Sequence, residues 1–593
     1  MTEWVHPAAI LIVGALFVPF LKGGLKKAYL LILPAVAFID ILHMSHGIYW
    51  VYNFLGNDLI FGKVDRLSLV FGYVFAIMAF IGIMYALHVE DDIQHMAALF
   101  YAGSSMGVVF AGDYFTLFIF WEIMAFSSAY LIFAKRGEAA INAGFRYLLV
   151  HIFGGVCLLA GIIIHYVNTG SMLFGPIEKD SIAFYLILVG FILNAAVPPL
   201  SAWLSDAYPE ATVTGSVFLC AFTTKTAVYV LVRAFPGTEI LVVLGVFMAI
   251  YGVVYAVLEN DCRRLLAYHI ISQVGYMVAG VGMGSEMALN GTVSHAFAHI
   301  LYKALLFMGT GAVIHMTGKR KLTELGGLYK TMPITLILYM VGAFAISAFP
   351  LFSGFVSKSM IVSAASNDHR PLVTLLLTMA SSGTFLHTGL KLPYYMFFGK
   401  ETGIKAKEPP LNMIVGMGIA AFLCVVIGVF PGALYAVLPY PVHFEPYTAD
   451  HVTGSLGILI FTALGFFLLL KKLDPEPTIS VDTDWFYRKG TKAFLWFVDN
   501  PMAGFSNQMK KIFSDYIPDS LIWFSRNPLA VLKMTADTML LPLSGPDQRI
   551  EIKKRIEKEK AIYPGDIIKH WPIGSTVLWI TLFLLTYLLA YYL

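Results

Sequence analysis

Apolar stretches long enough to cross a lipid bilayer recur along almost the whole chain, and they restrict its fold more than any other feature. One helical crossing takes about 20 predominantly apolar residues. Because 58% of the residues are hydrophobic and only 13% are charged, a soluble protein of this length could not cover its surface with polar groups. The chain is therefore predicted to be an all-α polytopic membrane protein. The candidate spans are roughly 8–21, 28–46, 66–88, 95–111, 114–134, 140–166, 181–204, 212–235, 238–258, 264–283, 291–316, 333–366, 371–398, 411–431, 452–470 and 573–593.

Two of these spans are interrupted in a way that predicts broken helices. The span at 333–366 is too long for one straight crossing, and Pro350 and Gly354 lie within it. The span at 181–204 carries Pro198-Pro199 in its second half. Proline removes a backbone donor and collides with the preceding helical turn, so each helix is expected to open inside the membrane.

Basic residues gather in alternate loops, as they do in membrane proteins whose basic loops face the cytoplasm. The N-terminus is therefore predicted to lie outside, in a multi-pass protein of the cell inner membrane. The start of the chain lacks the basic stretch of a cleaved signal, so a retained first helix is expected. The basic loops hold Lys22, Lys26, Lys27, Lys135, Arg136, Arg263, Arg264, Lys319, Arg320, Lys321, Lys330, Lys400, Lys405, Lys407, Lys471 and Lys472, and the main exceptions on the other side are Lys63, Arg66, Lys179 and Arg370.

The composition changes at about residue 473. From there to 572, charged residues alternate with aromatic groups such as Trp485-Phe486-Tyr487, a mixture typical of helices that lie along a membrane interface. Residues 547–561 are predicted to form a solvated cytoplasmic helix, and 573–593 a final transmembrane helix. The alternative for 473–572 is a small soluble domain.

Several ionisable residues fall in the middle of predicted spans. A charge at the bilayer centre costs about 2.5–3.5 kcal/mol on insertion scales, so it usually faces a protein or water-lined interior. A lysine in a low-dielectric site gives up its proton more readily, and a nearby glutamate opposes this. A row of such groups is therefore predicted to relay protons. The candidates are Glu122, Lys225, Lys358 and the set His295, His299 and Lys303, whose i, i+4, i+8 spacing places the three on one helical face.

Simpler interpretations exist for some of these residues. One buried Glu–Lys pair can merely pin two helices together. His295 and His299 could bind haem or a metal, but no matching pair of histidines is found at equal depth on a neighbouring span. His387 and Lys391, near the end of their span, are interpreted as interfacial anchors. No metal and no cofactor is predicted, and the scattered cysteines are interpreted as packing residues: Cys157, Cys220, Cys262 and Cys424.

Short motifs occur in a fixed order between about residues 60 and 470. They are Trp121-Glu122 with Ser127, Trp203-Leu204-Ser205-Asp206-Ala207, Arg264-Leu265-Leu266-Ala267-Tyr268 with Ser272-Gln273-Val274-Gly275-Tyr276, His299 with Lys303-Ala304-Leu305-Leu306-Phe307, and Ser353-Gly354-Phe355-Val356-Ser357-Lys358. In this order they resemble the antiporter-like subunits shared by complex I (NADH-quinone oxidoreductase) and Mrp-type Na⁺/H⁺ antiporters. The D subunit of the Mrp type looks nearest, while the tail at Thr483-Asp484-Trp485-Phe486-Tyr487 resembles the large distal subunit of complex I.

The resemblance implies a core of about 14 transmembrane helices that contains two inverted five-helix repeats, each with a broken helix. It implies that Glu122 tunes a neighbouring lysine and that Lys225 is the central lysine of the path. It further implies that His295, His299 and Lys303 form a relay, with Lys358 near the outer exit. The predicted segments are 1–94 (N-terminal helices), 95–235 (first repeat), 238–398 (second repeat), 399–472 (last core helices), 473–572 (interfacial and cytoplasmic segment) and 573–593 (final helix).

One departure from the family pattern concerns the first repeat. Family members usually carry a lysine in a Gly-Phe-x-x-Lys pattern on the broken helix, whereas this chain has Gly190-Phe191-Ile192-Leu193-Asn194. The histidine usually found two residues before Trp203 is Ser201. Asn194 can hydrogen-bond but cannot hold a proton, so Glu122 loses its expected partner. Either the first half of the path is altered, or Lys225 takes on the lost role.

The predicted function is that of a proton-translocating subunit of a multi-subunit Mrp-type Na⁺/H⁺ antiporter, with other hydrophobic subunits as partners and H⁺ and Na⁺ as the transported ions. One alternative is a proton-pumping subunit of a redox-driven complex, such as a relative of complex I or of a membrane-bound hydrogenase, with the redox cofactors on partner subunits. Another is a non-pumping membrane anchor that docks a cytoplasmic partner through 473–572. No nucleic-acid partner is predicted.

Overall fold

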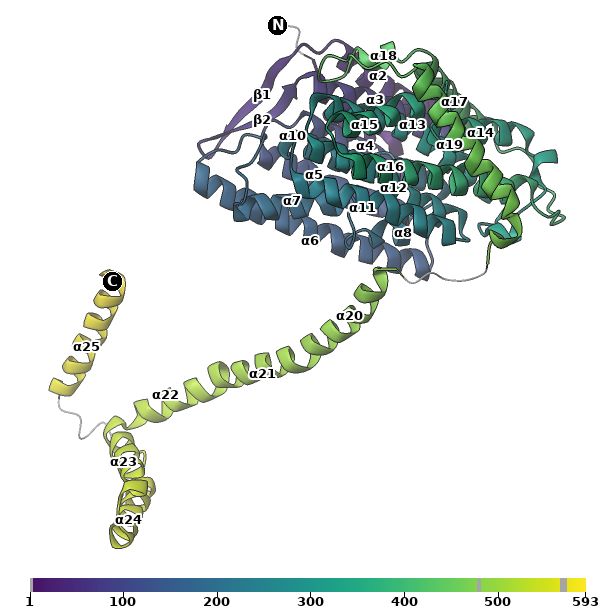
Figure 1. The fold of residues 1–593 in the computed structure, drawn as a ribbon. Helices are drawn as coiled ribbons and strands as arrows, with labels where there is room; N and C mark the ends of the chain where they lie inside the picture. The colour runs from purple at the N-terminus through teal and green to yellow at the C-terminus, as the bar shows by residue number, and fades with distance from the viewer. Residues whose placement is uncertain (1–3, 477–481, 566–572, 593) are drawn as a thin grey trace. The chain divides into compact units, whose positions relative to one another are not determined.

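The computed structural model describes residues 4–476, 482–565 and 573–592, and helices dominate it (Figure 1). The chain divides into two units, residues 1–485 and 486–593. The α-helices of the first unit are α1 (Pro7–Ala15), α2 (Gly23–Leu42), α3 (Arg66–Ala86), α4 (Asp92–Phe110), α5 (Tyr114–Phe133), α6 (Glu138–Thr169), α7 (Ile182–Asn194), α8 (Ala202–Ala207), α9 (Val213–Leu219), α10 (Thr223–Ala234), α11 (Glu239–Leu258), α12 (Cys262–Met283), α13 (Glu286–Thr317), α14 (Pro333–Ile346), α15 (Ser353–Asn367), α16 (Pro371–Thr384), α17 (Leu411–Val429), α18 (Gly432–Tyr435) and α19 (Ala449–Leu468). Short 3₁₀ turns are η1 (Val18–Phe20), η2 (Tyr208–Glu210), η3 (Leu322–Glu324), η4 (Leu328–Lys330) and η7 (Leu470–Lys472), and π-helical segments are η5 (Phe385–Lys391) and η6 (Tyr394–Phe398).

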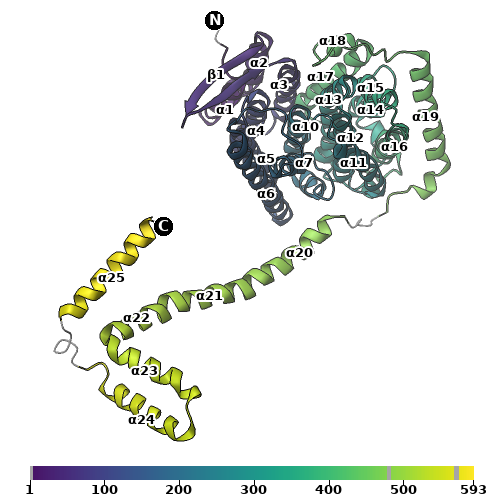
Figure 2. The same cartoon turned by 60° about the vertical axis from the view of Figure 1, so that its left-hand side comes forward.

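The length and apolar character of these helices confirm the predicted polytopic membrane fold. Ten helices in the described part of the chain are long and apolar enough to cross a membrane, and α7 and α14 are shorter apolar helices. Burial separates the inner helices from the outer ones. The apolar window of α12 is fully buried inside the first unit, whereas that of α19 is only 11% buried, and Figure 2 shows α19 at the edge of the bundle.

A β-hairpin interrupts the helical pattern near the N-terminus and was not predicted. Strands β1 (Gly47–Phe54) and β2 (Asn57–Val64) pair antiparallel, from Gly47 opposite Val64 to Phe54 opposite Asn57. Leu55 and Gly56 form the two-residue turn, both with positive φ, as the tight turns favoured in hairpins require. This segment lies between two predicted spans, where only a connecting loop was expected.

The two predicted interruptions are present and are built alike. After α7, Ala196 has φ of 59° and Pro198 follows; after α14, Ala348 has φ of 57° and Pro350 follows. Positive φ is rare for residues other than glycine and ends a helix sharply. Each break therefore leaves the last carbonyl groups of a half-helix without helical partners in the interior of the bundle.

Two further irregularities were not predicted. The expected span at 212–235 is divided into α9 and α10 by a short turn at 220–222, which contains neither proline nor glycine and so carries no breaker signal. The expected span at 371–398 becomes α16 followed by η5, whose wider π-helical turns carry His387 and Lys391. Single π-helical turns inside helices are often found at functional sites.

The second unit is also helical, and its helices expose most of their large apolar side chains. A small cluster of Ala530, Val531 and Met534 packs α23 with Phe524 and Tyr563. The apolar helix α25 is a candidate membrane span, as predicted. Residues 477–481, 566–572 and 593, parts of the predicted interfacial segment and final helix, lie outside the described residues. The elements are α20 (Asp484–Phe497), η8 (Val498–Met502), α21 (Ala503–Lys511), η9 (Ile512–Tyr516), α22 (Ile517–Arg526), α23 (Pro528–Leu540), η10 (Leu541–Leu543), α24 (Pro546–Ile562) and α25 (Ile573–Tyr592).

Candidate functional site

The predicted relay on α13 forms a continuous buried row. His295, His299 and Lys303 are all fully buried on this one helix, since positions i, i+4 and i+8 share a face. The imidazole Nδ1 of His295 lies 3.0 Å from Ser357 Oγ on α15. The Nζ of Lys303 lies 3.2 Å from Nδ1 of His269 on α12. The α13 face therefore contacts polar groups of two neighbouring helices, one at each end of the row.

Lys358 lies directly after the second break, in the early turns of α15. Its ammonium group donates a 3.0 Å hydrogen bond to the carbonyl of Ile346, the last residue of α14. The same ammonium lies 5.3 Å from the ring centroid of Tyr276. Lys358 is thus held by a carbonyl that the break frees, and its neighbour Ser357 contacts His295.

Lys225 is held in the same way at the unpredicted break in the first half. It lies in the first turn of α10, and its ammonium group donates to the carbonyl of Cys220, 2.6 Å away, at the end of α9. A second contact of 3.1 Å is made with the hydroxyl of Thr224. The carbonyl end of a half-helix carries partial negative charge and favours a cation. Lys225 and Lys358 are therefore both held by a carbonyl group at the end of a half-helix.

Glu122 lacks the cationic partner that the family pattern would provide. No ion pair joins it to a lysine or arginine in the described residues, and its Oε1 has no hydrogen bond. Instead the carboxyl group contacts α6 at Gly155, where a Cβ atom would come within 2.0 Å of Oε1. Asn194, at the position of the usual lysine, is fully buried at the end of α7.

Three buried histidines beside this row were not predicted to belong to it. His269 contacts Lys303 and lies 5.0 Å, centroid to centroid, from His387 in η5. His387 is fully buried, so its interpretation as an interfacial anchor is wrong. His151 on α6 is also buried and lies beside Asn194. None of the three has a second histidine one helical turn away in its span, and only packing brings it to the row.

Buried polar atoms without hydrogen-bond partners cluster along these helices. Most buried polar groups in proteins are satisfied, so such a cluster calls for bound solvent or an exchanging ion. Ser201 Oγ and Ser353 Oγ make no hydrogen bond of ordinary geometry, although they interact with Tyr251 and Cys424, and each lies at the start of the helix after a break. In the part of the chain that the structure describes, the unsatisfied side-chain atoms of this interior belong to Glu122, His151, Asn194, Ser201, Thr226, Gln273, His299, Thr310, Ser353 and His387.

Ion pairs outside the spans join the two halves on the side of the basic loops. Glu210 accepts hydrogen bonds from Lys135, after α5, and from Arg320, after α13, at 2.7 and 2.8 Å. Arg320 also pairs with Asp261, which caps α12. Burial alone would raise the pKa of Glu210, but the hydrogen bonds from Lys135 and Arg320 outweigh burial and hold that pKa below its usual value. The carboxylate is therefore the stable form at neutral pH.

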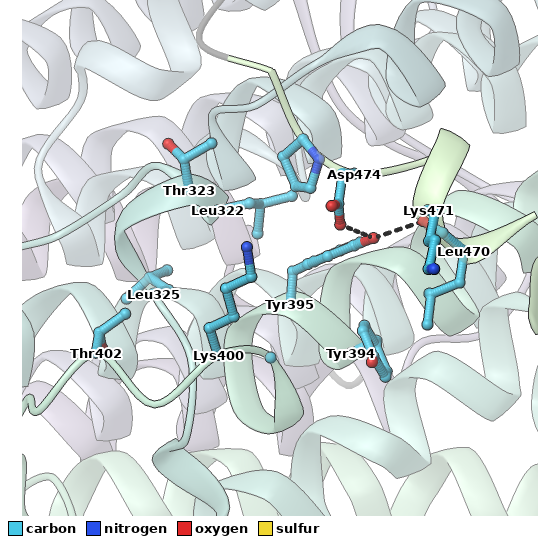
Figure 3. A pocket seen from close by; sticks show the side chains of 12 residues that line it. Leu322, Thr323, Leu325, Tyr394, Tyr395, Lys400, Thr402, Leu470, Lys471 and Asp474 are labelled. Carbon is cyan, nitrogen blue, oxygen red and sulfur yellow. Dashed lines mark hydrogen bonds between the residues drawn. The ribbon is translucent and has the colours of Figure 1, made fainter.

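A pocket of about 380 Å³ lies among helix ends and loops and is separate from the row (Figure 3). The Tyr395 hydroxyl donates to Asp474 at 2.8 Å and to the carbonyl of Leu470 at 3.3 Å, which joins η6 to the end of the first unit. None of the predicted relay residues lines it. The lining residues are Leu322, Thr323, Leu325, Tyr394, Tyr395, Gly399, Lys400, Thr402, Leu470, Lys471, Asp474 and Pro475.

The sequence is similar to those of known membrane proteins. Residues 111–384 match the family described as NADH:quinone oxidoreductase/Mrp antiporter, transmembrane. The chain is also similar to the A subunit of the Na⁺/H⁺ antiporter of Alkalihalophilus pseudofirmus, with 26% identity over 578 residues, which cover 83% of this chain and 70% of that protein. The matched family segment runs from just before α5 to the end of α16 and so contains every residue of the predicted row.

Two solved membrane complexes share the fold. A chain of the Mrp complex from Dietzia sp. superimposes with a TM-score of 0.66 at 20% identity, covering 76% of this chain and 99% of that one. A chain of respiratory complex I from Thermus thermophilus gives a TM-score of 0.63 at 21% identity, covering 73% and 99%. At 20% and 21% sequence identity, these similarities show a shared fold alone.

Proposed function

We propose that this chain, which belongs to the antiporter-like family of membrane subunits shared by NADH:quinone oxidoreductase and Mrp antiporters, is an ion-translocating subunit of a multi-subunit cation/proton antiporter. Protons move along the row formed by Glu122, Lys225, the α13 set and Lys358. Na⁺ is the proposed counter-ion, because the relative from Alkalihalophilus pseudofirmus is named for that exchange.

One observation carries the proposal. Lys225, Lys303 and Lys358 are buried, and in the described residues none of them has a carboxylate partner; each instead contacts a carbonyl, a hydroxyl or an imidazole. A buried lysine with a purely structural role is normally paired with an acid, because an unpaired buried charge is costly. Neutral partners allow each lysine to release its proton and take it back.

The contacts support one proposed order of proton transfer in the second half. Lys303 transfers its proton to the ring of His269, 3.2 Å away, and the neutral amine is then ready to accept another. His295 contacts Ser357, which precedes Lys358. Each transfer leaves one group neutral and makes the next cationic, so the row carries one positive charge at a time.

Within the Mrp type, the A subunit is the proposed counterpart of this chain. The sequence motifs resemble the D subunit most, whereas the A subunit of Alkalihalophilus pseudofirmus aligns over 83% of this chain, beyond the antiporter core. We propose that hydrophobic partner subunits surround the first unit in the cell inner membrane. The N-terminus lies outside, because that orientation places the basic loops in the cytoplasm.

The test is transport by the complete complex in proteoliposomes with a trapped pH indicator. Lys303→Ala should abolish Na⁺-driven proton movement, because the row loses the group that contacts His269. Lys319→Ala is the matched control, since Lys319 follows the same helix but is exposed. Undiminished transport in an assembled Lys303→Ala complex would overturn the proposal and favour a non-pumping anchor. Co-purified iron–sulfur subunits would make the driving force a redox reaction instead.

A further inference from the structure

We propose that His151 on α6 is the proton-holding group of the first half and does the work of the lysine that is absent at position 194. This role rests on the proposed function. It adds a proton-binding site, which is formed by His151, Glu122 and Asn194. His151 was not part of the predicted row. Its place in the structure, between α5 and α7, gives it this role.

His151 has the features of a reactive group rather than of a packing residue. Only 2% of it is exposed, and neither ring nitrogen makes a hydrogen bond of ordinary geometry among the described residues, although the Asn194 side chain interacts with the ring. Its ring packs between Tyr147, at 4.1 Å, and Trp203, at 4.6 Å, measured between ring centroids. Both neighbours use their polar atoms elsewhere: the Tyr147 hydroxyl pairs with Ser128, and the Trp203 indole N–H donates to Leu193. The aromatic rings fix the imidazole, and their own polar groups do not bind its nitrogen atoms.

Asn194 supports both protonation states of this imidazole. Its side chain lies against His151, but no hydrogen bond of ordinary geometry satisfies either amide atom in the described residues. An amide can turn its oxygen toward an imidazolium N–H or its NH₂ group toward a neutral ring nitrogen. A lysine at the same position would repel the imidazolium. The change from lysine to asparagine is therefore what a histidine-centred site requires.

Glu122, on α5, approaches the face of α6 that carries His151. Its carboxyl group contacts α6 at Gly155, four residues after His151 and hence one turn along the same face, a separation of about 6 Å along the axis. A gap of this length is one that a single hydrogen-bonded water bridges. A proton that leaves the Glu122 carboxylic acid and enters the imidazole makes a carboxylate and an imidazolium, an ion pair with no net charge.

Hydroxyl groups continue from His151 toward the start of α10. Tyr147, packed on the imidazole, interacts with the side chain of Thr223, whose hydroxyl also lies 2.6 Å from that of Tyr101. The next residue, Thr224, contacts the ammonium group of Lys225. A proton that leaves the imidazolium and reaches a neutral Lys225 restores the neutral imidazole. The site thus joins Glu122 to the rest of the row.

The test compares single and double variants of the complete complex in the same proteoliposome assay. His151→Gln keeps the size and a hydrogen-bonding group but cannot hold a proton, so proton flux should fall at least about 30-fold. Asn194→Lys in the native background should also lower flux at least about tenfold, through repulsion between two cations. The double variant should transport better than either single one, because the restored lysine replaces the lost histidine. His165→Gln is the control, a half-buried histidine on the same helix.

Each outcome decides the matter. Flux within about twofold of wild type in His151→Gln, while Lys303→Ala abolishes transport, would overturn this site and leave the proposed function standing. Proton flux in the double variant that is no higher than in His151→Gln would also overturn this site. If His151→Gln fails to assemble, Asn194→Lys alone decides, and wild-type flux in it overturns the site. Normal flux in both His151→Gln and Lys303→Ala would refute the proposed function itself.

Discussion

Replacing Gly155 by alanine should displace the Glu122 carboxylate without damaging the fold. The new Cβ would lie 2.0 Å from Glu122 Oε1, whereas ordinary van der Waals contact begins at 3.4 Å, so the carboxyl oxygen must retreat by about 1.4 Å. That atom ends a flexible side chain, so the displacement costs little conformational energy. Alanine in place of a helical glycine also stabilises the helix by up to about 1 kcal/mol.

The expected result is a well-assembled complex with impaired transport. A misplacement of about 1 Å in a reacting group can cost about 100-fold in rate, which corresponds to about 2.7 kcal/mol in the barrier. Proton flux in proteoliposomes should therefore fall by about two orders of magnitude, while thermal unfolding in detergent occurs at or above the wild-type temperature.

Gly154→Ala is the matched control for this experiment. It is the adjacent residue on the same helix, and its Cβ would meet only the side chain of Leu193, at 3.3 Å. Flux in this variant should stay within about twofold of wild type, since no proton-carrying group moves. Near-normal flux in an assembled Gly155→Ala complex would contradict the proposed site, because it would mean that the position of Glu122 against α6 does not matter for transport.

Further predictions concern the path, the loops and the second break. Lys225→Ala should lower flux at least about 100-fold while Asn194→Ala costs less than about fivefold, because only the lysine carries a proton; equal, severe losses would contradict this. Glu210→Gln should destabilise the protein by about 2 kcal/mol at pH 7 in thermal unfolding. Since the folded pKa of Glu210 is lowered, its contribution to stability is complete above the unfolded value of 4.5 and is lost as pH falls through the folded pKa. Wild type and variant should therefore converge at pH values below the folded pKa. Gly354→Ala should reduce assembled complex in membranes, since its Cβ would lie 1.8 Å from a backbone carbonyl oxygen, a strain of about 3 kcal/mol, whereas Gly432→Ala, in open space, should assemble normally.

Much of the architecture could be predicted from the sequence because membrane insertion imposes simple rules. Each crossing needs a long apolar run, and prolines interrupt helices at the residues that precede them. The breaks at Pro198 and Pro350 were found for this reason. The α13 row was found because helical geometry alone places residues four apart on one face.

The hairpin and the break before Lys225 escaped prediction for different reasons. The hairpin segment is short and mixes polar and aromatic residues, so it lacks an apolar run that would mark it. The turn at 220–222 contains neither proline nor glycine. Its geometry comes from packing, since the Lys225 ammonium group stabilises the carbonyl that the turn exposes.

The order of residues along the chain was enough to predict a polytopic helical membrane protein, two helix breaks, and the lysines and histidines within its helices. The contacts of those residues emerged only from the folded arrangement of the helices. Lys303 faces an imidazole rather than a carboxylate, and Glu122 lies against α6. His151 lies beside Asn194, although 43 positions separate them in the chain. Periodicity fixes which face of a helix a residue occupies, whereas its partner depends on which helices pack together and in what register.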